Sequence, residues 1–414
     1  MVNLLACRFV HNGYQNMSNK EDLGVQIPLS IKTITPLHIG GNDVLSPLAD
    51  YWMDDQKNIH LINEAELANS VYETGNTNKF IKEVEGVVTE KKGKMLQDFV
   101  RHSLRREIKD MLTGVSFKSY GINNPIEIDC CIQTNGLAYL PGSSLKGALR
   151  GALLLNWLSS GKPESDKALD DFLRALTIFS KRSDLRKNQQ AAEIEKVFRE
   201  QAEEKLFGSL KQDERLAAYC LRVNDSGIVS ENNISIYQLE RFNLSDNKDT
   251  IPVLKQCIDK STSLATTVYI DYYICHQKYH HPIFRDIISK GDLFALLNSV
   301  SLQLINYELN VLRSVEIVTG RINFYESFLD KLKETMHQSG NNKGFLRLGF
   351  GKMQFYQTIA MALYKKTGMD ENNSDWIEYL SYCDGLSGDI PAIYPATRVL
   401  TTAGLEPLGW VEIE

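Results

Sequence analysis

Alternating apolar and polar positions predict a strand near the start of the chain. Ile27, Leu29 and Ile31 are separated by polar or small residues and would share one face, which is the period of two expected of a half-buried strand. The strand should end at Pro36, because proline cannot donate a hydrogen bond within a central ladder. A glycine-containing loop at residues 37–43 is expected to follow it.

Two other stretches have the periodicity of amphipathic helices. Over residues 94–112 apolar residues recur at helical spacing, while Arg101, Arg105 and Lys109 follow at intervals of four and would form one basic stripe. Such a stripe is either a solvated face or a surface that faces phosphates. Farther along, a Pro-Gly turn at residues 141–142 predicts a helix that runs to about residue 158.

The remaining chain alternates between strand-rich and helix-rich segments. It divides into a flexible leader at 1–24, the first part of a sheet core at 25–160, a helical insertion at 161–215, a continuation of the sheet at 216–280, a helical segment at 281–340, and a glycine-rich loop, helix and C-terminal tail at 341–414. Strands that lie far apart in sequence, separated by helices of unequal length, indicate an α+β fold with a split antiparallel sheet.

Composition is that of a globular protein. The chain has 414 residues, 43% of them hydrophobic and 24% charged, proportions that exclude disordered, collagen-like and coiled-coil proteins. Lys and Arg total 46 against 52 Asp and Glu, so the net charge is −6. A uniformly basic nucleic-acid-binding protein is therefore excluded, and RNA or DNA would need a local basic patch.

Hydropathy and cysteine content predict a cytoplasmic protein without a membrane segment. No apolar run approaches the roughly 20 residues of a membrane span, and the run at 2–6 is too short for a signal sequence. The seven cysteines form no C-x-x-C pair, which favours buried reduced thiols. Cys275, His276, His280 and His281 are a weak metal candidate, because consecutive residues of a strand point to opposite faces. We expect no metal and no other cofactor.

The segment Pro141–Arg150 carries the strongest signal for ligand binding. A helix start exposes backbone N–H groups and the positive end of the helix dipole, which together attract phosphate. Lys146 and Arg150 lie four residues apart and so share a face. The alternative interpretation is a plain helix, capped by Ser143 or Ser144, whose leucine stripe packs into the core; both can hold on different faces.

A second glycine-rich motif spans Gly344–Lys352. Its glycines permit positive φ and a close backbone approach, and Arg347 and Lys352 flank them. The spacing fits neither a phosphate-binding P-loop nor a dinucleotide-binding fingerprint. A simple turn between a strand and a helix is the alternative.

Five motifs together resemble the RAMP superfamily of CRISPR effector proteins. They are TPLHIGGN at 35–42, LPGSSLKGALRGALL at 140–154, LFG at 206–208, VNDSG at 223–227 and LRLGFGK at 346–352. Within that superfamily, LSPL at 45–48, PATR at 395–398 and PLGW at 407–410 are similar to the head subunit of the type III-A (Csm) complex.

The resemblance implies a ferredoxin-like, RRM-related core with large helical insertions. It implies a non-catalytic subunit that binds the 3′ portion of the CRISPR RNA, caps a filament of related RAMP subunits, and supports RNA maturation by recruiting host nucleases. Binding guides of any sequence requires contacts to phosphates and sugars. The residues expected to make them are His38, Gly40, Gly41, Ser143, Ser144, Lys146, Gly147, Arg150, Arg347, Gly349, Gly351, Lys352 and Arg398. No short aromatic motif of the RRM kind is present, so the sheet face is not the expected RNA site.

Three enzymatic alternatives remain open. Related backbone subunits cut target RNA with an aspartate in a loop after the first strand, and Asp43 stands in such a place, with His38 near it in sequence as an acid or base. A second alternative is a histidine-centred endoribonuclease that processes the guide precursor. A third is a mononucleotide-binding enzyme that uses Gly349–Lys352.

Overall fold

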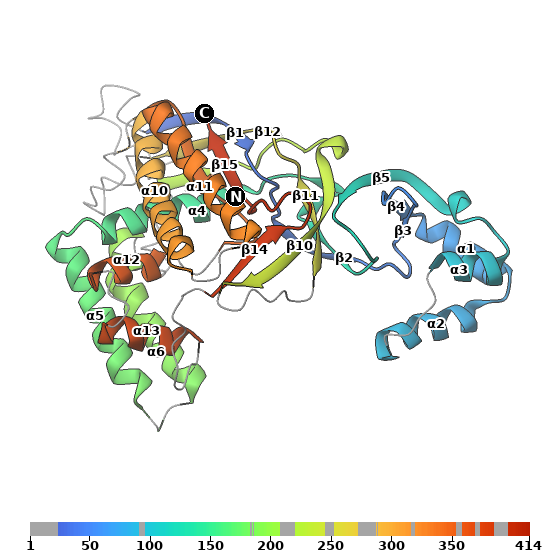
Figure 1. The fold of residues 1–414 in the computed structure, drawn as a ribbon, viewed down its shortest axis with the longest axis horizontal. Helices are drawn as coiled ribbons and strands as arrows, with labels where there is room; N and C mark the ends of the chain where they lie inside the picture. The colour runs from blue at the N-terminus through green and yellow to red at the C-terminus, as the bar shows by residue number, and fades with distance from the viewer. Residues whose placement is uncertain are drawn as a thin grey trace, which may run out of the picture.

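The structure consists of a two-sheet body and a smaller arm that projects from one side (Figure 1). It is a computed structural model, and it describes residues 24–90, 96–182, 184, 186–207, 220–244, 252–271, 287, 289–315, 319–352, 358–368, 373–384 and 396–414. The metal candidate at residues 275–281 and the leader at 1–23 lie outside the described residues.

The first sheet has five antiparallel strands with the predicted N-terminal strand at its centre. Their order is β13 (Gly344–Arg347), β15 (Trp410–Ile413), β1 (Val25–Thr33), β12 (Ser263–Ile270) and β9 (Leu221–Val223). Ile27, Leu29 and Ile31 are buried and the residues between them are exposed, as the alternation predicted. This amphipathic strand therefore sets which face of the sheet meets the core.

The second sheet has eight strands and is mixed. Seven follow the order β2 (Gly40–Leu45), β6 (Ile128–Cys131), β11 (Val253–Ile258), β10 (Ile234–Asn243), β5 (Leu112–Tyr120), β4 (Ile59–Ile62) and β3 (Tyr51–Met53), and β14 (Thr397–Thr401) pairs with β10. The β10–β5 and β11–β6 ladders are parallel. A separate hairpin joins β7 (Gln133–Thr134) and β8 (Leu137–Ala138). The expected loop at 37–43 is thus largely strand, because β2 pairs with β6.

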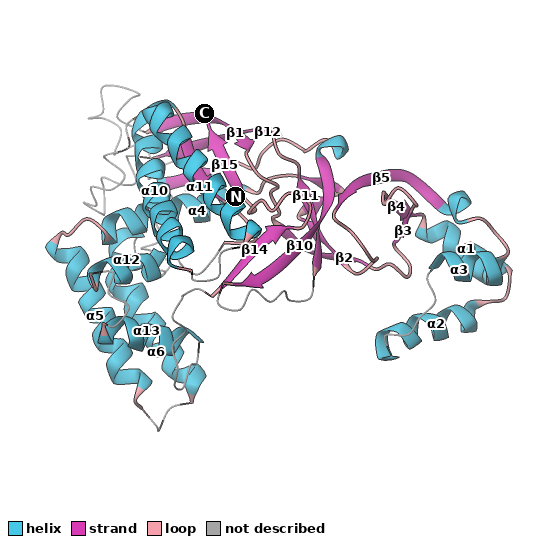
Figure 2. Ribbon diagram, in the orientation of Figure 1, coloured by secondary structure: helices cyan, strands magenta, loops and turns pink. Residues whose placement is uncertain are grey.

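Helices gather at one end of the body, as Figure 2 shows. They are α4 (Gly142–Leu158), α5 (Pro163–Ser180), α6 (Lys187–Phe198), a π-helical turn at Arg199–Glu203, α7 (Glu204–Phe207), α10 (Lys290–Ser314), α11 (Gly320–Ser339), α12 (Thr358–Lys366) and α13 (Ser374–Asp384). α10 contacts α4 and β13, α12 also packs on α4, and α13 packs on α5. No helix in the described ranges is long and apolar enough to cross a membrane.

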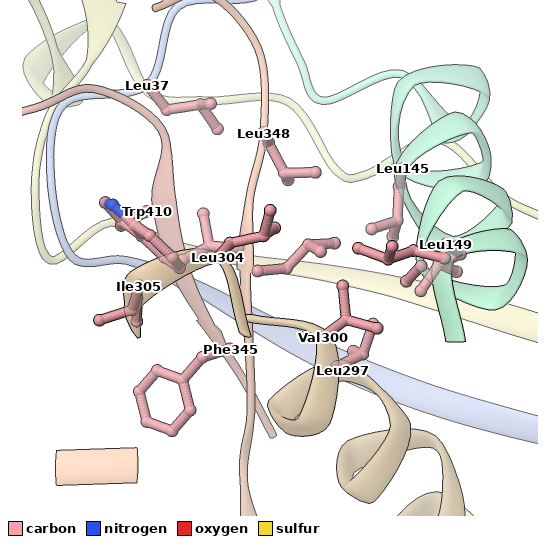
Figure 3. Close-up of a cluster of buried hydrophobic side chains, with 14 of the residues drawn as sticks. Leu37, Leu145, Leu149, Leu297, Val300, Leu304, Ile305, Phe345, Leu348 and Trp410 are labelled. Atoms are coloured by element: carbon pink, nitrogen blue, oxygen red, sulfur yellow. The ribbon is translucent and has the colours of Figure 1, made fainter. Parts of the chain in front are cut away.

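The main core lies between the first sheet and the helices α4 and α10. Leu145 and Leu149 of α4 face Leu297 and Val300 of α10 (Figure 3). Phe345 of β13 and Trp410 of β15 fill the same cluster, and both are fully buried. The leucine stripe of the helix after residue 141 thus packs as its spacing predicted.

The arm has its own hydrophobic cluster and corrects one helix prediction. It contains α1 (Glu64–Glu73), α2 (Thr77–Glu90) and α3 (Leu96–Phe99), which continues as a π-helical turn at Val100–Leu104. Arg105 then adopts a left-handed conformation with φ 55°, a short 3-10 turn follows at Ile108–Met111, and β5 begins. The helix predicted at 94–112 is therefore present only over residues 96–104, and the basic stripe is not continuous, because the helical conformation ends at Arg105 before the chain enters β5.

Candidate nucleic-acid interface

Helix α4 begins against the backbone of a neighbouring loop. Its N-cap is Pro141, without a side-chain cap, so the predicted capping by Ser143 or Ser144 is wrong. A Cβ added to Gly142 would lie 2.3 Å from the carbonyl oxygen of Val223, so only glycine permits this approach. The contact brings the 223–227 loop, one of the motifs noted in the sequence, onto the helix start.

An acidic side chain of that loop occupies the first N–H of α4. The Gly142 N–H donates to Asp225 Oδ1 at 2.7 Å. A carboxylate at a helix N-terminus interacts favourably with the helix dipole. Asp225 therefore takes the first N–H of the helix start, where the sequence had suggested a phosphate.

Side chains of α4 form a cationic cluster one turn into the helix. Burial lowers the pKa of Lys146, and the positive charges of Arg150 and then of Arg222 lower it further. Lys146 and Arg150 therefore lie close enough to repel each other, as expected of residues four apart on a helix, and Arg222, on the strand β9 that contacts α4, has a smaller effect on Lys146. Concentrating like charges costs free energy that a bound polyanion would recover.

Carboxylates lie beside two of the three cations. Arg150 lies 3.7 Å from Glu203, and Arg222 lies 3.3 Å from Asp271. The Arg150 side chain is 38% exposed and that of Arg222 is 56% exposed, so these pairs are solvent-screened and weak.

Small residues extend the exposed face of α4. Ser143 and Gly147 are exposed, and Ser144 is half-buried. A Cβ added to Gly147 would meet no atom of the described residues within 4 Å, so their packing does not require a glycine there.

Arg222 is a residue that the sequence reasoning missed. It stands between Leu221 and Val223 on a three-residue strand and its guanidinium lies over the Tyr269 ring, 5.5 Å from the centroid. The alternation around it would have shown that it points away from the core, but only the β9–β12 pairing places it beside α4.

The second glycine-rich motif forms a structural turn. Gly349 has φ 68°, and a Cβ there would lie 2.1 Å from the carbonyl oxygen of His38. That same carbonyl accepts the N–H of Phe350 at 2.9 Å. Gly351, with φ 85°, offers its carbonyl to Arg347 at 3.0 Å. These contacts fix the turn against the segment that leaves β1.

Two of the predicted cations are buried in ionic or hydrogen-bonded contacts within the protein. Arg347 is 4% exposed, and its Nε donates to the Leu408 carbonyl at 2.9 Å. Arg398 is 1% exposed and forms two hydrogen bonds with Glu308 of α10, whose side chain is also buried. Arg347 and Arg398 therefore connect segments of the body, whereas Lys352 is exposed.

His38 is buried and Asp43 is exposed. His38 is 2% exposed, its Nδ1–H donates to the Gln256 carbonyl at 2.7 Å, and burial lowers its pKa, so the imidazole is neutral. Asp43 lies on the exposed edge strand β2, where a bulge follows the exposed Gly40 and Gly41. Among the described residues no group of three or more His, Cys, Asp or Glu side chains could hold a metal ion.

Comparisons with known proteins place the chain in a family. A family model described as the RAMP superfamily matches residues 30–354. The chain belongs to the RAMP superfamily. The resemblance noted in the sequence is thereby confirmed, together with the α+β architecture that it implied.

Similar proteins narrow the likeness to type III-A systems. The chain is 24% identical to a protein named "CRISPR system Cms protein Csm5" of Methanocaldococcus jannaschii, over 94% of this chain and 89% of that one. A chain in a structure of a type III-A Csm–crRNA–target RNA ternary complex matches with a TM-score of 0.65 and 20% identity, over 93% and 99% of the two chains. A crystal structure of T. onnurineus Csm5 matches with a TM-score of 0.58, also at 20% identity, over 92% and 99%.

Proposed function

We propose that this RAMP protein is a non-catalytic subunit of a type III-A CRISPR effector complex that binds the 3′ side of the CRISPR RNA and caps the subunit filament. The observation that carries the proposal is the pair of half-exposed cations Lys146 and Arg150, with the exposed Arg222 on the neighbouring strand, in a chain whose family match spans residues 30–354. Cations that face solvent beside small residues bind a backbone without reading bases.

The proposed contact surface is narrower than the set of residues expected from sequence. It consists of Ser143, Ser144, Lys146, Gly147, Arg150 and Arg222, with Gly40, Gly41 and Lys352 as further exposed positions. His38, Arg347 and Arg398 are left out because their polar groups are engaged inside the body. Gly349 and Gly351 hold the turn that carries Lys352.

Capping is proposed from the helices that surround one end of the body. Head-to-tail contacts between subunits continue unless something closes them, and α5, α6 and α13 add bulk beyond the two sheets. Co-expression with the other Csm subunits and a CRISPR RNA, followed by mass measurement of the intact complex, tests this. One copy of this chain per complex is the expected result, and a ladder with several copies contradicts it.

RNA retention tests the binding surface directly. In the same co-expression, Lys146→Ala with Arg150→Ala should reduce the CRISPR RNA that co-purifies, while a matched double variant on the arm, Lys79→Ala with Lys82→Ala, should not. Normal RNA retention by the first variant would contradict the placement. The length of the retained RNA, compared with and without this chain, tests the proposed part in maturation and recruitment of host nucleases.

Absence of catalysis is proposed from the surroundings of Asp43. His38, its suggested acid or base, is buried and hydrogen-bonded to a backbone carbonyl. A single-stranded RNA incubated with the purified chain, with and without Mg²⁺, should remain intact. Cleavage that disappears in Asp43→Ala would instead favour a target-RNA endonuclease.

A further inference from the structure

Two tyrosines meet on the face of the second sheet that points away from the main core. Along β5, Phe117 is buried, whereas Lys118 and Tyr120 are exposed. In the parallel β5–β10 ladder Lys118 is in register with Ser235 and Tyr120 with Tyr237. Because residues two apart share a face, these four side chains lie on one surface.

The Tyr120 ring stacks on the Tyr237 ring and remains accessible. The ring centroids are 4.8 Å apart and the planes are inclined by 26°. Tyr237 is 8% exposed and Tyr120 is 38% exposed. Tyr237 thus covers one face of the Tyr120 ring, while Tyr120 as a residue stays exposed.

Hydrogen bonds fix the lower ring of the pair. The Tyr237 hydroxyl donates to Asp259 Oδ1 at 2.9 Å, and the Ser235 hydroxyl donates to Asp259 Oδ2 at 2.8 Å. Burial first, and then the charge of Asp259, raises the pKa of Tyr237, so its hydroxyl stays protonated as a donor. Tyr120 therefore rests on a ring that does not move freely, which reduces the entropy lost when a third ring is added.

We propose that the accessible ring of Tyr120 is a stacking platform for one nucleobase of single-stranded RNA, with Lys118 beside it to bind an adjacent phosphate. Stacking on an aromatic ring is tolerant of sequence, as a guide-binding protein requires. The alternative is a cross-strand aromatic pair that only stabilises the sheet. The proposal rests on the proposed RNA-binding function and adds a base contact to its backbone contacts.

The sequence concealed this site because its two halves are far apart. A sheet that binds bases through short aromatic motifs is visible in sequence, and no such motif is present here. Tyr120 and Tyr237 are brought together only by the parallel pairing of β5 with β10. The expectation that the sheet face plays no part in RNA binding is therefore revised by this proposal.

Photocrosslinking locates the base contact without altering the protein. The full-length chain is irradiated with a single-stranded RNA that carries 5-iodouridine, and the modified peptides are mapped by mass spectrometry. We expect a crosslink at Tyr120 and none at Tyr72, which is 80% exposed on α1 and serves as the control for accessibility alone. Crosslinks that avoid Tyr120 overturn the platform.

Variants of Tyr120 measure how much the stacking platform contributes to the affinity for RNA. Tyr120→Leu should weaken RNA binding at least about fivefold, the effect of losing about 1 kcal/mol of stacking at 1.4 kcal/mol per tenfold change. Tyr120→Phe should bind as the wild type does, and Tyr72→Leu should change nothing. Thermal unfolding shows whether Tyr120→Leu is folded; if it is not, the crosslink and the Phe variant decide.

The outcomes separate the platform from the function on which it rests. Wild-type chain that binds RNA, with normal affinity in Tyr120→Leu and no crosslink at Tyr120, rejects the platform and leaves the proposed function intact. Wild-type chain that binds no single-stranded RNA, alone or in the assembled complex, rejects both.

Discussion

The helix start at 141–150 and the glycine-rich turn at 344–352 have similar sequences but different roles in the structure. Both combine glycines with an arginine and a lysine. In the helix start, the cations stay half-exposed and Gly147 faces open space. In the turn, Arg347 is buried among backbone carbonyls and Gly349 touches the carbonyl of His38.

The difference lies in what each motif packs against. α4 buries its leucine stripe and so leaves its polar stripe to solvent. The turn lies between the segment after β1 and the segment before β15, whose carbonyl groups need donors. A glycine near a cationic residue in the sequence thus indicates a place where another group can come close to the backbone. Only the packing shows whether that group is a ligand or another segment of the chain.

The largest effect should come from a buried cation outside both motifs, Arg398. Arg398→Ala leaves Glu308 charged and unpaired inside the body, so we expect a loss of about 3–5 kcal/mol in the free energy of unfolding. Denaturant unfolding measures it. The double variant Arg398→Met with Glu308→Leu should recover most of the loss, because neither charge then remains. Wild-type stability in Arg398→Ala would show that the pair does not hold α10 to β14.

Paired glycine variants test the contrast between the two motifs directly. Gly349→Ala must relieve a 2.1 Å contact and a positive φ, so we expect a loss of more than about 2 kcal/mol. Gly147→Ala, in a helix with open space around it, should instead stabilise by about 0.5–1 kcal/mol. Equal effects of the two changes on the unfolding midpoint would contradict the distinction.

Acid should weaken the turn through His38. Its folded-state pKa lies below the ordinary value of 6.5 because the ring is buried, so below pH 6.5 the unfolded state binds a proton that the folded state excludes. Stability should be constant for this group above pH 6.5 and fall below it by at most about 1.4 kcal/mol per pH unit. His38→Asn retains a donor for the Gln256 carbonyl and should show a smaller slope between pH 7 and 5; an unchanged slope contradicts the assignment to His38.

The smallest effect on stability should come from the half-exposed cations of α4. Lys146→Ala with Arg150→Ala should change the free energy of unfolding by no more than about 0.5 kcal/mol for each residue. The log–log salt dependence of single-stranded RNA binding should become shallower by about 1.4, since each phosphate contact contributes about 0.7. Filter binding at several salt concentrations measures it, with Lys79→Ala and Lys82→Ala as the control. An unchanged slope would mean that these cations do not face RNA.

Local sequence patterns were sufficient to predict the elements whose tertiary contacts favour the same secondary structure. The alternation around Ile27 predicted β1, and the spacing of Leu145 and Leu149 predicted the buried face of α4. The helix predicted over residues 94–112 ends early because Arg105 leaves the helical conformation and the chain enters β5. The periodicity of a segment shows which of its residues are apolar. It does not show where the segment stops being helical or which strand the following residues pair with.

The features of the candidate site also divide into those that the sequence predicts and those that only the tertiary structure decides. The sequence by itself determined the family, the strand-and-helix framework and the pairing of Lys146 with Arg150, because these follow from motifs and from spacing along one element. Only the tertiary structure decided that Asp225 occupies the helix start, that Arg222 joins the cationic cluster, that Arg347 and Arg398 are buried, and that Tyr120 stacks on Tyr237. Each of these depends on contacts between segments distant in the chain, and burial and charge are set by such contacts rather than by the residue's immediate neighbours in sequence.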